Sequence, residues 1–205
     1  MKIVPGDQEH RAAHKLISAI VAPRPVALVS TVGEDGVFNL APFSAFTILC
    51  VTPAIICFSI MQRRSGLKKD TLKNVEFTKD FVINVVDEAL GEKMNQTSAS
   101  YPSCVDEFEE VGLTPVGSDI VKAPRLAESP VNMECKVLQI LEFGESPNAS
   151  SVVIGEVVLL HVRDSLLVNG EIQNSELKAI ARLGGDLYCR TRDVFEMKRP
   201  ASGYD

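Results

Sequence analysis

The chain has 205 residues, 45% of them hydrophobic and 23% charged, which is typical of one globular domain over residues 1–205. Its formal net charge of −6, without a long basic stripe, argues against a nucleic-acid partner. Because no run is long and apolar enough to span a bilayer and the charged N-terminus lacks the pattern of a secretory signal, we expect a cytoplasmic protein without a membrane contact.

The first part of the chain predicts one helix followed by three strands. A helix is expected within residues 1–20, with Asp7 placed to cap it. The apolar runs 25–32 and 37–40 flank a Gly-Glu-Asp-Gly turn, which predicts a hairpin. A further apolar run, 54–60, has the pattern of a buried strand.

The middle of the chain predicts a helix, a strand and an insertion. Asp70 is expected to cap a helix over residues 70–78, and residues 81–86 form another strand-like run. The segment 88–124 is expected to be an insertion of helices and loops, anchored by Met94 and Phe108.

The β signal returns near the C-terminus. Residues 131–143 and 151–162 predict an antiparallel pair, and residues 175–181 a short helix capped by Ser175. Many strands with short turns and few helices favour a mainly β protein with peripheral helices (α+β), built around an antiparallel barrel.

The chain shows no convincing metal-binding pattern. His10 and His14 are one helical turn apart but have no Glu or Cys arranged around them, so we expect exposed helix histidines. The five cysteines form no Cys-x-x-Cys pair, and we expect them to be reduced thiols. No metal is therefore expected.

A basic loop is the first candidate binding site. Four cations precede a helix whose first turn contains Thr71, and both the free N–H groups and the dipole of a helix N-terminus favour an anion. The alternative is a solvated basic loop beside an Asp-capped helix. The cations are Arg63, Arg64, Lys68 and Lys69.

The second candidate is the bend from Asn39 to Phe46. Pro has no N–H, so Ala41-Pro42 is expected to interrupt the strand ladder and to free backbone N–H groups from Phe43 to Thr47. Small residues there would let a flat ligand approach the backbone. The alternative is an ordinary strand end with a buried Asn. The small residues are Ala41, Ser44 and Ala45.

Three further candidates lie outside these segments. Arg24, between two prolines, could reach a phosphate or ring carbonyl, or could lie on the surface at a strand start. His161, at a strand end, could contact a nicotinamide or be an ordinary hydrogen-bonded polar residue. The segment Arg182 to Tyr188 contains Gly184-Gly185. The structural interpretation of the two glycines is a helix stop, and the functional one is a place where a ligand can approach the backbone closely.

No Ser-His-Asp or Cys-His arrangement and no paired carboxylates stand out, so no catalytic residue is assigned. This absence fits a cofactor enzyme, in which the protein binds and orients a group that supplies the reactive atom.

An ordered set of short segments resembles the flavin reductase-like, FMN-binding split-barrel family. The segments are Pro23-Arg24-Pro25, Asn39-x-Ala41-Pro42-x-Ser44-x-Phe46, Lys69-Asp70-Thr71-Leu72-x-Asn74 and Arg182-Leu183-Gly184-Gly185. The resemblance implies a split β-barrel of antiparallel Greek-key type and a homodimer with one FMN per subunit near the interface.

The resemblance also implies roles for individual residues. The backbone from Asn39 to Thr47 and Ser44 would face the flavin ring and ribityl chain. Ser59 and the loop from Arg63 to Thr71, which includes Lys69 and Asp70, would hold the phosphate. Arg182 to Tyr188 would approach the flavin from the partner subunit.

The expected function is therefore an FMN-dependent oxidoreductase that takes hydride from NADH or NADPH and passes electrons to free flavin, an iron complex or a small redox partner. FMN is expected over FAD, because the basic loop offers one compact anion site and no second glycine-rich phosphate turn is present. The alternatives are a non-catalytic, flavoredoxin-like electron carrier and a protein that uses the same groove for another ligand.

Overall fold

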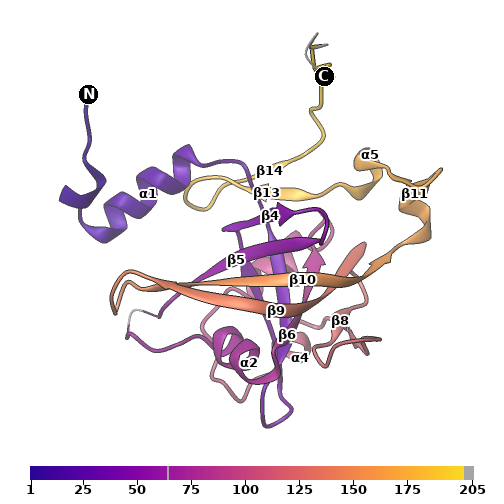
Figure 1. Ribbon diagram of the computed structural model, residues 1–205, viewed down its shortest axis with the longest axis horizontal. Helices are drawn as coiled ribbons and strands as arrows, with labels where there is room; N and C mark the ends of the chain where they lie inside the picture. The colour runs from indigo at the N-terminus through magenta and orange to yellow at the C-terminus, as the bar shows by residue number, and fades with distance from the viewer. Residues whose placement is uncertain (64, 201–205) are drawn as a thin grey trace.

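The computed structural model of the protein describes residues 1–63 and 65–200. Its main element is a seven-stranded sheet in the order β3-β2-β6-β9-β10-β5-β4, in which every pair of neighbours is antiparallel (Figure 1). The strands are β2 (Ala27–Val32), β3 (Phe38–Phe43), β4 (Phe46–Cys50), β5 (Ile55–Met61), β6 (Asp80–Val85), β9 (Val131–Phe143) and β10 (Ser150–Val162).

The sheet curls so that its two edge strands, β3 and β4, meet at the bend 44–45. The rings of Phe43 and Phe58 lie 5.2 Å apart inside the curl. Ser59 N donates to Ala45 O beside the Phe46–Phe58 pair, which extends the β4–β5 ladder into the bend. Within the described residues no ladder joins β3 to β4, so the barrel remains split along this seam. The predicted mainly β split barrel is confirmed.

The sheet is buried on both faces around β2. Ala27 and Val29 point into the barrel core, whereas Leu28 packs against the insertion 88–124 on the other face. Met94 and Phe108 are almost fully buried in that outer layer, which confirms them as anchors. The insertion's helices are α3 (Gly91–Gln96) and α4 (Glu107–Glu110), and its short strands are β7 (Pro115–Val116) and β8 (Arg125–Leu126).

A glycine in β10 lets the barrel close tightly. A Cβ at Gly155 would lie 2.6 Å from the ring of Phe81, and the β9–β10 register shifts between Ile154 and Gly155. Any side chain at this position would displace the ring, because the interior is close-packed.

The remaining elements lie around the barrel. A small sheet, β1-β13-β14, lies above β4 in Figure 1, and α1 extends to one side with no buried residue. No helix within the described part of the chain is long and apolar enough to cross a membrane. The bounds are η1 (Pro5–Asp7), α1 (His10–Ile20), β1 (Arg24–Pro25), α2 (Asp70–Thr78), η2 (Asp164–Leu166), β11 (Leu167–Val168), β12 (Glu171–Ile172), α5 (Asn174–Leu177), β13 (Ile180–Arg182) and β14 (Tyr188–Arg190).

Three local predictions were wrong. Asp7 does not cap α1, because it ends a 3-10 turn and Glu9 precedes the helix. Lys69, not Asp70, occupies the N-cap position of α2. The helix predicted at 175–181 begins at Asn174 and stops at Leu177, because residues 180–182 pair with β1 and β14 instead.

Candidate functional site

A buried amide network joins the β2–β3 hairpin to the start of α2. Asn39 Nδ2 donates to Thr31 Oγ1 over 3.2 Å and to Thr71 Oγ1 over 3.0 Å. Asn74 Nδ2 donates to the same Thr31 oxygen over 3.0 Å. Because Asn39, Thr31 and Thr71 are buried, this network holds the first turn of α2 in one place against the hairpin.

Lys69 stands at this helix start and lacks a counter-charge. Its Nζ lies 5.6 Å from the centre of the Phe43 ring and makes no hydrogen bond or ion pair with the described residues. Burial, with a smaller contribution from the charge of Arg63, lowers the pKa of Lys69. No side chain caps α2, so its first N–H groups are also available to an outside acceptor.

The other described cations of the loop, Arg63 and Lys68, are already paired. Asp70 accepts from Arg63, from Lys73 over 2.9 Å and from Ser103 over 2.7 Å, and Lys68 pairs with Glu76. Burial opposes ionisation of Asp70, but the hydrogen bonds from Lys73 and Ser103 and the charges of Lys73 and Arg63 outweigh it and lower its pKa. Arg64 lies outside the described residues. Among the described cations of the loop, Lys69 is left for an anion.

The bend after β3 lies next to Lys69, because Lys69 lies over the ring of Phe43, the last residue of β3. The expected break at Ala41-Pro42 was wrong: both residues pair with β2, opposite Val29 and Leu28. Pro42 is tolerated because β3 is an edge strand of the sheet and its missing N–H disrupts no inner ladder. The chain turns only at residues 44–45, and Phe46 and Thr47 then pair with β5.

A second cluster contacts the bend from the opposite side. Arg24 Nε lies 3.5 Å from Ser44 Oγ, and its guanidinium also donates to the carbonyls of Ser18, Val21 and Leu183. Arg24 therefore fastens α1 and the loop after β13 to the bend. Its guanidinium is occupied by carbonyl oxygens in this structure.

Arg182 and the two glycines have clear structural roles. Arg182 donates to Tyr188 Oη over 2.6 Å and lies over the Tyr188 ring, 4.9 Å from its centre. A Cβ at Gly184 would lie 3.0 Å from Ala19 Cβ, so the close approach made there is to α1. Gly185 adopts φ of +61°, which allows the turn into β14.

The structure adds Gln62, which the sequence did not single out. Gln62 directly follows β5 at the start of the basic loop, and its side-chain Oε1 is buried with no hydrogen-bond partner among the described residues. A buried unpaired amide is costly, and an amide can present either its oxygen or its nitrogen to a ligand. The orphaned atom fits a ligand with hydroxyl or phosphate groups at this loop.

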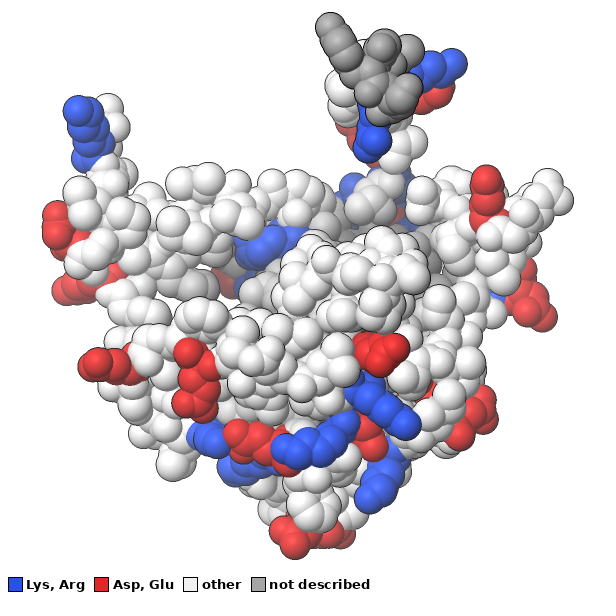
Figure 2. All heavy atoms as spheres, viewed as in Figure 1, with Lys and Arg blue, Asp and Glu red and all other residues white. Residues whose placement is uncertain are grey.

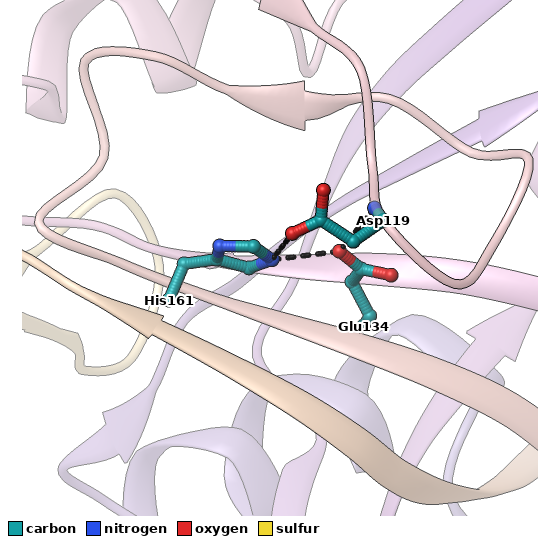
Figure 3. Close-up of side chains that lie close together, drawn as sticks. All are labelled: Asp119, Glu134 and His161. Carbon is teal, nitrogen blue, oxygen red and sulfur yellow. Dashed lines mark hydrogen bonds and ion pairs between the residues drawn. The ribbon is translucent and has the colours of Figure 1, made fainter.

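His161 does not join this site. It lies nine positions along β10 from Val152, the residue opposite Ser59, which is about 30 Å along a strand. Figure 3 shows its ring pointing at two carboxylates, and Nε2 donates to Glu134 Oε1 over 2.7 Å. The alternative interpretation, a hydrogen-bonded polar residue, therefore describes its contacts.

A cleft of about 510 Å³ opens on the other side of α2. It is lined by Asn39 and Asp70 together with the β2–β3 turn and residues 102–107. Glu107 lines this cleft and accepts from Leu40 N over 3.0 Å. Burial, opposed by that hydrogen bond and aided by Asp106 and Asp70, raises the pKa of Glu107 to about 7. No local pattern singles out Glu107, since its burial depends on how α4 packs.

The predicted site residues thus fall into two clusters that meet at the bend. Lys69, Thr71 and Asn39 lie on the α2 side, while Arg24 and Arg182 lie on the side of β13. Ser44 and Ala45 connect the two clusters, because Ser44 Oγ contacts Arg24 and the carbonyl of Ala45 accepts a hydrogen bond from Ser59 N on β5.

Comparison with known proteins agrees with this architecture. Residues 21–178 match the sequence profile of the flavin reductase like domain. The chain belongs to the flavin reductase-like family. The matched residues include the basic loop and the bend, whereas the Arg182–Tyr188 segment lies beyond them.

Solved structures extend the family likeness to almost the whole chain. Nitrilotriacetate monooxygenase component B from Bacillus cereus is 34% identical, with a TM-score of 0.92, over 96% of this chain and 98% of that one. The 2-nitrobenzoate 2-nitroreductase NbaA of Pseudomonas fluorescens is 30% identical, with a TM-score of 0.88, over 98% and 96%. A Shewanella frigidimarina protein with a split barrel domain is 25% identical, with a TM-score of 0.82, over 98% and 100%.

Replacement of Glu107 by Gln should change how stability depends on pH. An ordinary Glu ionises near 4.5, whereas Glu107 in the fold ionises near 7, so the folded state holds its proton longer. The unfolding free energy of the natural protein should therefore fall as pH rises from about 4.5 to 7. Gln keeps the acceptor for Leu40 and cannot ionise, so the variant should gain about 1–2 kcal/mol relative to the natural protein over this range, after discounting for solvent screening.

Denaturant unfolding at pH 5 and pH 8 measures this difference. Glu109→Gln, on the exposed side of the same helix, is the matched control and should show no such gain. Equal behaviour of the two variants would contradict the assignment.

Proposed function

We propose that the protein is an FMN-dependent oxidoreductase. The observation that carries this proposal is Lys69, a half-buried cation that has no counter-charge in the part of the chain that the structure describes. It lies at an uncapped helix start beside the bend of the split barrel. A dianionic phosphate is the ligand that such a site favours, since charge-assisted hydrogen bonds and the helix dipole act together.

The residues on both sides of Lys69 fit the rest of the cofactor. The N–H groups at the start of α2, Ser59 and the orphaned amide of Gln62 would hold the phosphate and ribityl hydroxyls. The small residues of the bend, Ser44 and Ala45, would let the flat ring lie against the backbone. One anion site, with no second phosphate turn, favours FMN over FAD.

When bound, FMN would accept a hydride from NADH or NADPH and release two electrons to free flavin, an iron complex or a small redox partner. The protein's own part is to bind and orient the ring. Two of the similar proteins are named as a monooxygenase component and as a nitroreductase, and both names favour redox chemistry. The second candidate function, a non-catalytic electron carrier, uses the same site.

We also propose that the working unit is a homodimer that covers the flavin. No residue of helix α1 is buried in the single chain. Ile17 and Ile20 on the helix and Val21 just after it are apolar and exposed. Ile48 and Val51, from β4 and the turn after it, are exposed too, at 67% and 80%. Figure 2 shows the area over β4 without charge, while charged side chains gather over α2 lower in the same view. An apolar surface of this kind is typical of a protein–protein interface.

Reduction by nicotinamide separates the enzyme from the carrier. FMN-loaded protein mixed anaerobically with NADH or NADPH should lose the absorbance of oxidised flavin at a rate typical of enzyme turnover. Addition of an electron acceptor should then restore this absorbance. A carrier would bind FMN and remain oxidised until a chemical reductant was added. Protein that binds no flavin at all would exclude both functions.

Replacement of Lys69 by Ala should weaken FMN binding about 10- to 100-fold, or about 1.5–3 kcal/mol, because one charge-assisted contact to phosphate is lost. Riboflavin, which has no phosphate, should bind both proteins equally. Lys68→Ala is the matched control, since Lys68 already pairs with Glu76. Fluorescence titration measures all the affinities, and equal loss for FMN and riboflavin would refute the phosphate assignment.

Dimerisation and FMN binding should be coupled if the partner covers the ring. Binding that favours the dimer must shift the monomer–dimer equilibrium towards it. Sedimentation of the apo and FMN-loaded protein over a dilution series measures the shift. A monomer with full FMN affinity would argue against the shared site and leave the FMN assignment intact.

A further inference from the structure

Three side chains that can bind metals converge at the end of the barrel far from Lys69. Glu134 on β9 pairs with Leu159 and His161 on β10 pairs with Asn132, so the two are diagonal neighbours on one face of the sheet. Asp119 reaches them from a loop that crosses this face (Figure 3). One ligand atom from each residue lies within 4.8 Å of the other two.

The distances are close to those of ligands on one metal ion. His161 Nε2 lies 2.7 Å from Glu134 Oε1 and 3.7 Å from Asp119 Oδ2. Ligand atoms about 2.0–2.2 Å from a metal are roughly 3.0–3.5 Å apart at octahedral or tetrahedral angles. The observed pairs bracket this range, and an ion would take the place of the proton between His161 and Glu134.

Glu134 is also oriented as a metal ligand would be. Its carboxylate is fully buried and accepts from the backbone N–H groups of Asp119, Ile120 and Val121. These bonds, one to Oε1 and two to Oε2, fix the orientation of the carboxylate, as outer-shell contacts do around metal ligands. Among the described residues no Lys or Arg pairs with it, and buried carboxylates are typically paired with a cation or bound to a metal.

We propose that Asp119, Glu134 and His161 bind one divalent first-row transition metal ion. One imidazole and two carboxylates suit Zn²⁺ or Mn²⁺, and water would complete the shell on the exposed side of Asp119, whose side chain is 66% exposed. Because the ligands come from β9, β10 and the loop between β7 and β8, the ion would fasten that loop to the barrel. The site is separate from the proposed flavin site.

The test removes the competing histidines first. His10 and His14 are exposed on α1 one turn apart, so the background protein carries His10→Ala and His14→Ala. After treatment with EDTA and desalting, it is titrated calorimetrically with Mn²⁺, which thiolates bind poorly, and with Zn²⁺. At least one of the two ions should bind with one equivalent per chain and raise the unfolding temperature.

Two further variants decide whether the cluster is the site. His161→Gln keeps a donor for Glu134 but removes the imidazole ligand, and Asp119→Asn weakens the exposed ligand. Each should reduce the affinity for that ion at least about tenfold, since even outer-shell changes cost that much. Circular dichroism without metal should show both variants folded.

Either of two results would overturn the proposal. The first is that the background protein binds neither ion with one-to-one stoichiometry. The second is that His161→Gln binds as tightly as the background protein, which would leave the cluster as a hydrogen-bonded His–carboxylate pair. If both variants unfold without metal, the background protein, which keeps His161, is modified with diethyl pyrocarbonate instead. The metal should protect His161 from modification. Equal modification with and without metal would refute the site.

Discussion

The position of the candidate site depends on one contact, the amide of Asn39 between Thr31 and Thr71. It joins two β-strands and a helix through buried polar atoms that have few other partners, so their geometry has little freedom. Because the start of α2 is held this way, Lys69 lies over Phe43, the last residue of β3 before the bend. The hydrogen bond from Asn74 to Thr31 supports the same placement of the helix from its second turn.

Among the described residues of the loop before α2, Lys69 carries the one charge without an opposite partner. Asp70 forms ion pairs with Arg63 and Lys73 and accepts a hydrogen bond from Ser103, and Glu76 pairs with Lys68. These paired charges therefore contribute little net electrostatic field. Within the described part of the loop, a ligand would therefore meet a localised cation held over Phe43. This arrangement selects by geometry, whereas a strongly basic surface would attract anions of any shape.

Local patterns were enough to predict most of the barrel, because β-branched runs and turn residues act over a few positions. The basic loop was located for the same reason, whereas the bend was expected to start at Ala41-Pro42 and lies at residues 44–45. Gln62 and the His161–Glu134 pair were missed, because burial and pairing across 27 residues are decided by how β9 and β10 align. In the segment 180–182 a helix was predicted that does not form. Its residues pair with β1 instead, and β1 lies too far away in the sequence for a local pattern to reveal the pairing.

The glycine in β10 ties the far wall of the barrel to the candidate site. The ring of Phe81 lies against Gly155, and the rings of Phe58 and Phe43 follow at 5.2 Å each, with Lys69 above the last. A close-packed row of this kind transmits displacement with little loss. The depth at which the lysine sits is therefore set partly from β10, and relatives that differ in the bulk of this aromatic row should differ in ligand affinity even where every contacting residue is the same.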